Sequence, residues 1–187
     1  MTVFAIPAVD VTVYWALLAI ALLVVMSPLL VLRRDGAART LRNVVRAALL
    51  ILPLTAALGY TMADNELRLE GDRIVLRASH FYEQARPLAD FDLQRARAGS
   101  LASMPEARLG VRSNGISLPG YAAGRFTGQG GAVFALLTDR SRLVYLPAMT
   151  GPSLLISVEQ PDNFLAALRA VGHAPGHATG MTHAPGP

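Results

Sequence analysis

The hydrophobic pattern of the chain changes once, after about sixty residues, from continuous to alternating. From Val11 to Leu32 no side chain is charged and most are apolar. A helix over this stretch is roughly 33 Å long at 1.5 Å per residue, which matches the hydrocarbon core of a bilayer. We therefore predict a first transmembrane helix over residues 11–32, preceded by a short N-terminal segment over residues 1–10.

A second apolar stretch covers residues 44–62. Arg46 lies near its start, where a long side chain can reach the lipid headgroups. Its alternative, a buried amphipathic helix, would show a polar stripe, and none is present. A cleaved signal peptide is the alternative for the first stretch, but no basic residue precedes that run and the run is too long. We expect a membrane hairpin of two spans.

The charges around the two stretches predict their orientation. The connecting segment, residues 33–43, is rich in arginine, and short arginine-rich loops stay in the cytoplasm. Tyr14, Trp15 and Tyr60 fall at the opposite ends of the spans, where amphipathic rings favour the membrane interface. We expect a cytoplasmic loop over 33–43 and an extracytoplasmic C-terminal domain.

From residue 65 to residue 172 apolar and polar positions alternate in short runs separated by turn residues. A hairpin is predicted around Gly71-Asp72, and a second one around Asn114-Gly115, between Val111 and Ile116. Further strands are predicted over residues 88–94, 121–126, 131–138, 143–148 and 153–158. Short strands with regular turns are typical of an antiparallel sandwich or barrel.

A helix is predicted at about residues 161–171. Pro161 suits the first helical position, and Asp162 lies near the positive end of the helix dipole. Phe164, Leu165 and Leu168 recur at helical spacing and give one apolar face. Such a helix would cover the open end of a small barrel.

These segments together resemble the bacterial pleckstrin-homology-like families, in particular members with two N-terminal membrane helices. The resemblance covers roughly residues 65–170. It is carried by Asn114-Gly115, Gly124-Arg125-Phe126, Leu154-Leu155-Ile156-Ser157 and Pro161 through Phe164. It implies a seven-stranded, partly open barrel capped by the last helix, and no catalytic residue. Eukaryotic relatives often bind phosphoinositides through basic loops, but Arg73 and Arg77 alone give no such cluster here.

Composition excludes several other functions. The chain has no cysteine, so disulfides, zinc–thiolate sites and thiol nucleophiles are absent. The sequence pI of about 10.1 suggests nucleic-acid binding. However, residues 33–46 carry most of the net charge of +4, and the part that follows is close to neutral. A nucleic-acid footprint would need a basic face on the folded domain, so we predict none.

Few residues carry candidate chemistry. His80 is the one histidine before the tail and therefore the one candidate for a Ser-His-Asp system in the domain. No G-x-S-x-G elbow accompanies it, so we expect a surface or strand-end histidine. Asp90 and Asp92 form either an acid–base pair or, as we expect, a solvated strand face. The glycine-rich residues 128–131 precede a strand and are therefore interpreted as a turn and not a phosphate loop.

Two further groups leave binding open. The tail, residues 173–187, holds His173, His177 and His183 among Pro and Gly; we expect disorder without a specific metal site. Five arginines of the β domain would offer an anionic lipid or peptide a contact if they cluster: Arg108, Arg112, Arg125, Arg140 and Arg142. We expect ordinary surface charge instead, and a sheet edge that accepts a peptide strand is another option.

The sequence therefore predicts a membrane helical hairpin followed by a mainly-β, pleckstrin-homology-like barrel capped by a C-terminal α-helix. We expect a non-catalytic binding or assembly module of the bacterial cell envelope, without catalytic residues, cofactor or metal. The alternative is an accessory subunit of a membrane transporter or envelope enzyme with contacts through the hairpin. The lipid bilayer is the expected partner; a membrane protein partner, a second copy of the chain and a small-molecule ligand stay open.

Overall fold

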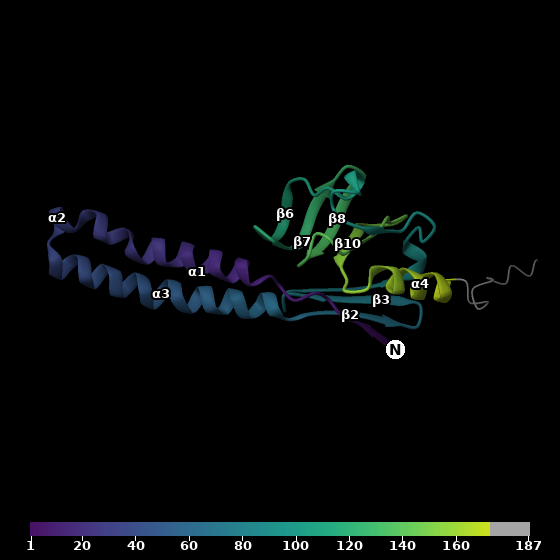
Figure 1. Ribbon diagram of the computed structural model, residues 1–187, viewed down its shortest axis with the longest axis horizontal. Coiled ribbons are helices and arrows are strands. Elements are labelled where there is room, and N and C mark those ends of the chain that lie inside the picture. Colours follow the sequence, from purple (N-terminus) through teal and green to yellow (C-terminus); the bar gives the residue numbers. More distant parts are fainter. Residues whose placement is uncertain (173–187) are drawn as a thin grey trace, which may run out of the picture.

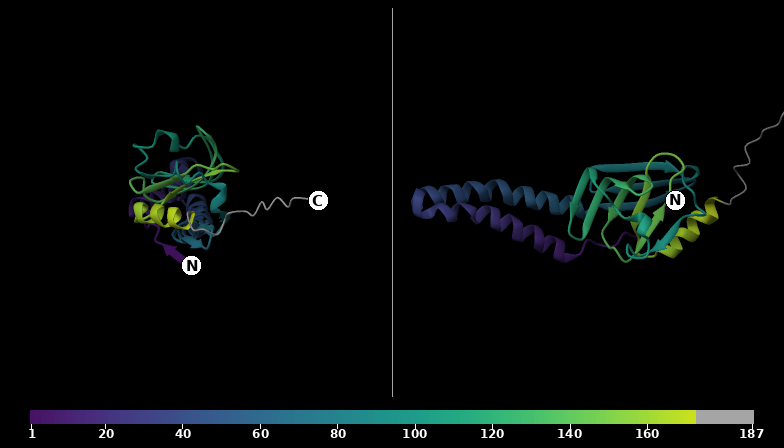
Figure 2. Two further views of the ribbon diagram at one scale, coloured as in Figure 1. Left: turned by 90° about the vertical axis from the view of Figure 1, so that its right-hand side faces the viewer. Right: turned by 90° about the horizontal axis from the view of Figure 1, so that it is seen from above.

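The computed structural model describes residues 1–172, apart from the side chain of Asp35. A pair of helices projects as a narrow stalk from one end of a mainly-β domain (Figures 1 and 2). The first arm of the pair comprises α1 (Val11–Met26), η1 (Ser27–Val31) and α2 (Leu32–Asp35), and the second is α3 (Ala37–Ala63).

Local chemistry explains where the helices begin and break. The Asp10 carboxylate accepts a hydrogen bond from Thr12 N at 2.7 Å and caps α1. Pro28 lies in the 3₁₀ stretch after α1, where its missing N–H interrupts the α-helical ladder. Gly36, with φ of 77°, makes the turn between the arms. The predicted loop over 33–43 is therefore wrong as local structure, because residues 37–43 already belong to α3.

Both arms are long and apolar enough to cross a membrane, over Val11–Arg34 and Ala37–Ala63, and are candidate membrane spans. Small residues bring them together: the Tyr14 ring lies against Gly59, 3.6 Å from where a methyl group there would sit. Ala21 and Val25 are also buried, but most apolar side chains of the pair are exposed. A helix in the core of a water-soluble protein would instead be mostly buried.

The β domain contains two sheets, formed within the described residues. The first sheet has the order β1-β2-β3-β4 and is antiparallel throughout. Its strands are β1 (Thr2–Phe4), β2 (Asn65–Glu70), β3 (Arg73–Ala78) and β4 (Tyr82–Pro87). The chain thus places its first residues in a sheet with residues that follow α3.

The second sheet has the order β5-β9-β10-β8-β7-β6, and β10 runs parallel to β8. Its strands are β5 (Arg97–Gly99), β6 (Arg112–Leu118), β7 (Tyr121–Gly128), β8 (Gly131–Leu137), β9 (Leu143–Leu146) and β10 (Ser153–Ser157). The loop after β8 passes over one strand position, and β10 returns to fill it. Short 3₁₀ turns, η2 (Leu88–Asp90) and η3 (Pro105–Ala107), lie in the connections.

The main core lies between the two sheets and is closed by α4 (Pro161–Gly172). Leu67 and Leu76 of the first sheet and Phe134 and Ile156 of the second are buried in it. Strands of the two sheets cross at a steep angle in Figure 1. Steep crossing is one of the two regular ways in which sheets pack face to face.

A partly open barrel was expected, and within residues 1–172 the two sheets do not close into a barrel. The edge strands β4 and β6 come close, but they are joined by a side-chain bond, Tyr82 Oη to Asn114 Oδ1 at 3.2 Å, and no backbone ladder joins them. The parallel pairing of β8 with β10 also departs from an up-and-down barrel. The mainly-β domain with a C-terminal helix is confirmed.

Of the two hairpins predicted from turn residues, one is confirmed and the other is wrong. The hairpin at Gly71 is confirmed, with φ of 59° at that glycine. The hairpin at Asn114-Gly115 is wrong, because both residues lie inside β6 and the chain turns at Pro119-Gly120. Gly115 is needed there for another reason: a Cβ would lie 2.2 Å from the Ala123 carbonyl oxygen of β7.

Two other segments differ from the prediction. Residues 88–94 do not form a strand, because η2 ends at Asp90 and the Asp92 carboxylate accepts the backbone N–H groups of Gln94 and Arg95 in a turn. The strands β1, β4 and β5 were not predicted. The last strands and the helix from Pro161 are confirmed within one or two residues.

Candidate functional site

A wide hollow on the β domain lies on the outer face of the second sheet. It has a volume of about 750 Å³ and a floor of Ala122 and Phe126 from β7 and Leu137 from β8. Its wall is the segment over residues 100–110, whose Leu101 and Leu109 pack toward the same face. We call this hollow the outer groove.

Backbone hydrogen bonds hold the wall of the outer groove at both ends. Leu101 N donates to Arg140 O at 2.9 Å, and Gly110 N donates to Thr127 O at 2.7 Å. Between these ties, Met104 and Ala107 are buried against the sheet. The groove is therefore lined by backbone that is fixed on both sides, which favours a preformed binding surface.

Two arginines, Arg108 and Arg140, line the outer groove and are exposed. Among the described residues neither has a carboxylate within ion-pair distance. Guanidinium groups next to an apolar floor suit a ligand that has both an apolar and an anionic part.

The other three predicted arginines do not join this pair. Arg142 is held by Asp139, with Nε 2.8 Å from Oδ2. Arg125 precedes Phe126 on β7, so strand alternation places it on the opposite face of the sheet. Arg112 is opposite Phe126 in register but is not part of the groove lining. Of the five candidate arginines, the structure thus places two in one hollow.

The loop that carries Arg140 is rigidly bonded. Ser157 Oγ accepts the N–H groups of Thr138 and Asp139, both at 3.0 Å, and donates to Asp139 O at 2.8 Å. Hydrogen bonds from Ser141, followed by the Arg142 guanidinium, lower the pKa of Asp139 to about 2. The Asp139 carboxylate is therefore committed to holding the loop.

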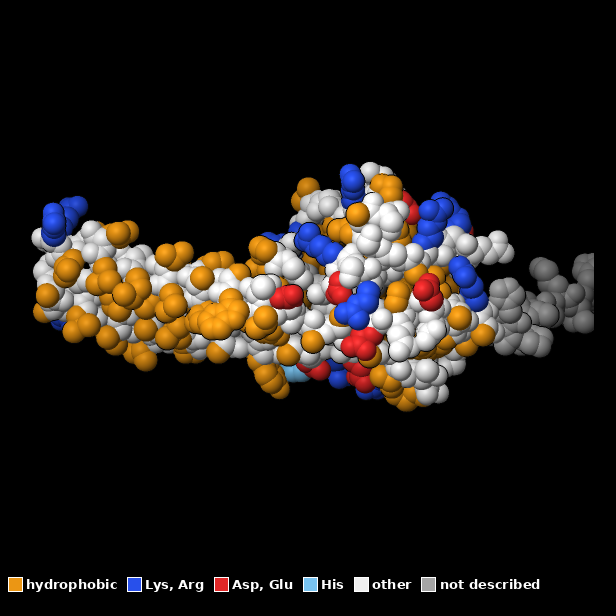
Figure 3. All heavy atoms as spheres, viewed as in Figure 1, with side chains coloured by type: hydrophobic (Ala, Val, Ile, Leu, Met, Phe, Trp, Pro, Cys, Tyr) orange, Lys and Arg blue, Asp and Glu red, His pale blue; other side chains and the backbone are white. Residues whose placement is uncertain are grey.

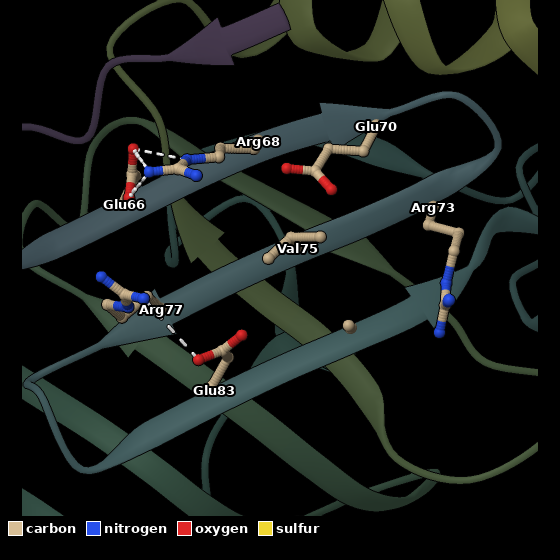
Figure 4. Close-up of a pocket in the computed structure, with 8 residues that line it drawn as sticks. Glu66, Arg68, Glu70, Arg73, Val75, Arg77 and Glu83 are labelled. Atoms are coloured by element: carbon tan, nitrogen blue, oxygen red, sulfur yellow. Dashed lines mark hydrogen bonds and ion pairs between the residues drawn. The ribbon is translucent and has the colours of Figure 1, made fainter. Parts of the chain in front are cut away.

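A second, smaller hollow of about 230 Å³ lies on the outer face of the first sheet (Figure 4). Val75 and Ala85 form its centre, and charged side chains surround it: Glu66, Arg68, Glu70, Arg73, Arg77 and Glu83. Arg68 pairs with Glu66, and Arg77 Nη2 lies 3.8 Å from Glu83 Oε2. Three acids offset three arginines, so this face has no single sign of charge and is a solvated sheet face.

The predicted chemical residues have structural partners. His80 lies in the turn between β3 and β4, where its Nδ1 lies against the Asp64 carboxylate. Its neighbour Ser79 is buried beside Tyr121, whose pKa is raised to about 12 by burial, so this serine faces the core and not a substrate. Ser79 is therefore not accessible as a nucleophile beside His80.

Asp90 and Asp92 do not form a pair. Asp90 accepts from Arg86 Nε and Nη2 at 3.2 and 3.1 Å, whereas Asp92 caps the turn described above. The segment over residues 128–131 is the turn between β7 and β8, as predicted. Within residues 1–172 no group of three or more His, Asp or Glu could hold a metal ion. His173, His177 and His183 lie outside the described residues.

Arg86 was not singled out from the sequence. Its side chain is only 12% exposed, it lies 4.4 Å from the centre of the Phe91 ring, and it donates to the carbonyl groups of Thr150 and Pro152. It therefore ties the end of β4 to the turn between β9 and β10. The proline at residue 87 marked a strand end, but nothing local indicated these distant acceptors.

No protein-family model, curated protein or solved structure matched the chain. The resemblance to the bacterial pleckstrin-homology-like families therefore stays a prediction, and function is argued from the geometry alone.

Proposed function

We propose that this chain is a membrane-anchored, non-catalytic binding or assembly module of a bacterial cell envelope. In this proposal α1 and α3 cross the bilayer, and the β domain is held at the extracytoplasmic membrane surface. The outer groove is its binding surface, for a ligand that combines an apolar part with an anionic group.

The observation that carries the proposal is the uncovered apolar surface of the helix pair. Figure 3 shows hydrophobic side chains along its whole length, with basic side chains at the tip farthest from the domain. Such a surface is unfavourable in water and favourable in lipid. Leu23, Leu30 and Leu49 are among its most exposed residues.

The N-terminal strand argues against a cleaved signal peptide. Thr2, Val3 and Phe4 pair with residues 67–69 of β2, and the Phe4 ring packs against Phe164. Cleavage after α1 would remove one strand of the first sheet. This pairing also requires residue 2 and residue 69 to be on the same side of the bilayer, as a hairpin of two crossings demands.

The ends of the stalk support the orientation. Arg33, Arg34 and Arg39 lie around the tip, and short basic connections stay in the cytoplasm. We propose a non-catalytic domain because the candidate catalytic side chains already have structural partners: His80 contacts Asp64, Asp90 pairs with Arg86, and Asp92 caps a turn.

Cysteine labelling tests the placement, because the chain has no native cysteine. Ala38→Cys at the tip and Met149→Cys on the domain are both exposed. In intact cells an impermeant maleimide should label M149C and leave A38C unlabelled until the membrane is permeabilised. The reverse pattern would overturn the orientation, and labelling of both in intact cells would overturn the two crossings.

Replacing the spans separates the module from the alternative, an accessory subunit whose helices make the partner contacts. A chain with α1 and α3 exchanged for an unrelated membrane hairpin should retain its ligand if the outer groove binds it. Loss of the ligand with a folded β domain would favour the accessory subunit.

A further inference from the structure

The turn between β3 and β4 lies beside the end of α3. Ala78 pairs with both Asn65 and Tyr82, so residues 79–81 are level with Asp64, the residue that ends α3. Ser79 N donates to Asp64 O at 3.0 Å and to Asn65 Oδ1 at 3.2 Å. These bonds fix the turn at the point where α3 ends and β2 begins.

Side-chain contacts bring the same turn against the stalk. The His80 ring lies edge-on to the Tyr60 ring, with 5.6 Å between centroids, and its Nδ1 pairs with Asp64. Ser79 and His80 have positive φ angles of 56° and 51°, an uncommon conformation for residues with side chains. These two residues set the direction of the turn, and Phe81 follows them directly.

Phe81 is an exposed aromatic residue next to the candidate spans. Its side chain is 69% exposed, and that of Tyr60 is 70% exposed. An exposed phenylalanine in a turn is unfavourable in water, whereas aromatic rings favour the lipid interface. Trp15, also exposed, lies near the start of α1 at the same end of the stalk.

A second apolar turn reaches the stalk from the other sheet. Leu118, the last residue of β6, and Pro119, in the turn to β7, line a narrow gap together with α1 residues from Val13 to Ile20. A Cβ at Gly120 would lie only 2.8 Å from Val13 Cγ2, so the turn is in close contact with the helix. Ile20 lies roughly 14 Å along the helix from Val11. A bilayer that begins near Val11 therefore surrounds this turn.

We propose that the β domain is partly embedded in the lipid interface through these two turns, residues 79–81 and 118–120. This inference rests on the proposed crossing of the bilayer by α1 and α3, and it adds a direct contact between the domain and lipid. One turn comes from each sheet, so together they fix the tilt of the domain. The Ser117–Ala122 end of the outer groove adjoins the second turn and so opens close to the lipid surface.

Depth-dependent quenching of tryptophan fluorescence tests the inference in the full chain. Trp15 is the single tryptophan. The variants W15F/F81W and W15F/P119W are reconstituted into phosphatidylcholine vesicles with bromine at a shallow acyl position. We expect fluorescence to fall about twofold relative to unbrominated vesicles, because an interfacial indole lies within reach of the shallow bromines.

The matched control is W15F/M149W. Met149 is as exposed as Phe81, at 66%, but it lies in the turn contacted by Arg86, roughly 16 Å farther along β4. Its fluorescence should not change. Equal quenching of M149W would indicate adsorption of the whole surface and would overturn the inference, as would unquenched F81W and P119W.

The unmodified chain separates this inference from the proposed function. Quenching of Trp15, with retention in the membrane after alkaline extraction, and no quenching of F81W would leave the spans intact and overturn the embedded turns alone. An extractable chain with unquenched Trp15 would overturn both.

Discussion

The ring of Phe4 in the first strand packs edge-on against the ring of Phe164 in the last helix, with 4.8 Å between centroids and 67° between planes. Glu159 N donates to Ala5 O at 3.0 Å beside this pair. The segments before the helix pair and at the end of the domain therefore form one core. The β domain is complete only when residues on both sides of the helix pair come together.

Phe4→Ala should destabilise the β domain by about 1–3 kcal/mol, because it removes a partly buried ring and its aromatic contact. The free energy of unfolding is measured with denaturant in detergent micelles. Val3→Ala is the control: Val3 is on the same strand but is 59% exposed, so the loss should stay below about 0.5 kcal/mol. Equal effects would show that β1 contributes pairing and no side-chain packing.

Arg86→Lys should also destabilise the domain, by about 1–3 kcal/mol, although charge is retained. A lysine cannot bond Asp90 through two nitrogens and also reach the carbonyl groups of Thr150 and Pro152, so these acceptors, some of them partly buried, lose their donors. Thermal unfolding followed by circular dichroism measures the loss. The exposed Arg73→Lys on the charged face should be neutral, and a stable R86K variant would contradict the role assigned to Arg86.

The lowered pKa of Asp139 predicts that the free energy of unfolding decreases at low pH. Its folded-state pKa is about 2, below the ordinary value of 3.8, so the contribution is present above pH 4 and is lost as the pH falls from about 4 to 2. The carboxylate is partly exposed, so we expect about 1 kcal/mol. Asp139→Asn should remove this part of the pH profile, and the exposed Glu159→Gln should preserve it. An unchanged profile in D139N would contradict the prediction.

Arg108→Gln together with Arg140→Gln should weaken binding in the outer groove by about tenfold or more, because two charge-assisted contacts are lost. The intact protein is captured from native membranes, and bound lipids and proteins are compared between variants. Arg112→Gln with Arg125→Gln is the matched control, since neither arginine lines the groove. Loss of the bound molecule in the control alone would place the site elsewhere.

Local patterns predicted the elements whose boundaries are chemically marked. Gly71 ends a strand with a positive φ angle, and Pro161 begins a helix, so both boundaries could be found from neighbouring residues. The alternation around Leu67 and Ile74 likewise showed which face is buried.

Long-range pairings could not be predicted in the same way. Asn114-Gly115 has the composition of a tight turn, but Gly115 is required because β7 comes too close for a side chain. The insertion of β10 between β8 and β9 depends on the whole sheet and leaves no local signal. The outer groove was found only in part, because its two arginines come from loops that distant backbone bonds bring together.

The pairing of β1 with β2 orders the events of biosynthesis. Residues 2–4 are synthesised before their partner strand, which follows only after some sixty residues and both helices. In the proposed topology, this strand therefore stays unpaired until α3 has inserted and β2 has reached the same side of the bilayer. The proposed topology thus couples insertion of the hairpin to folding of the sheet, and a chain with only one crossing would leave the edge of β2 without its partner strand.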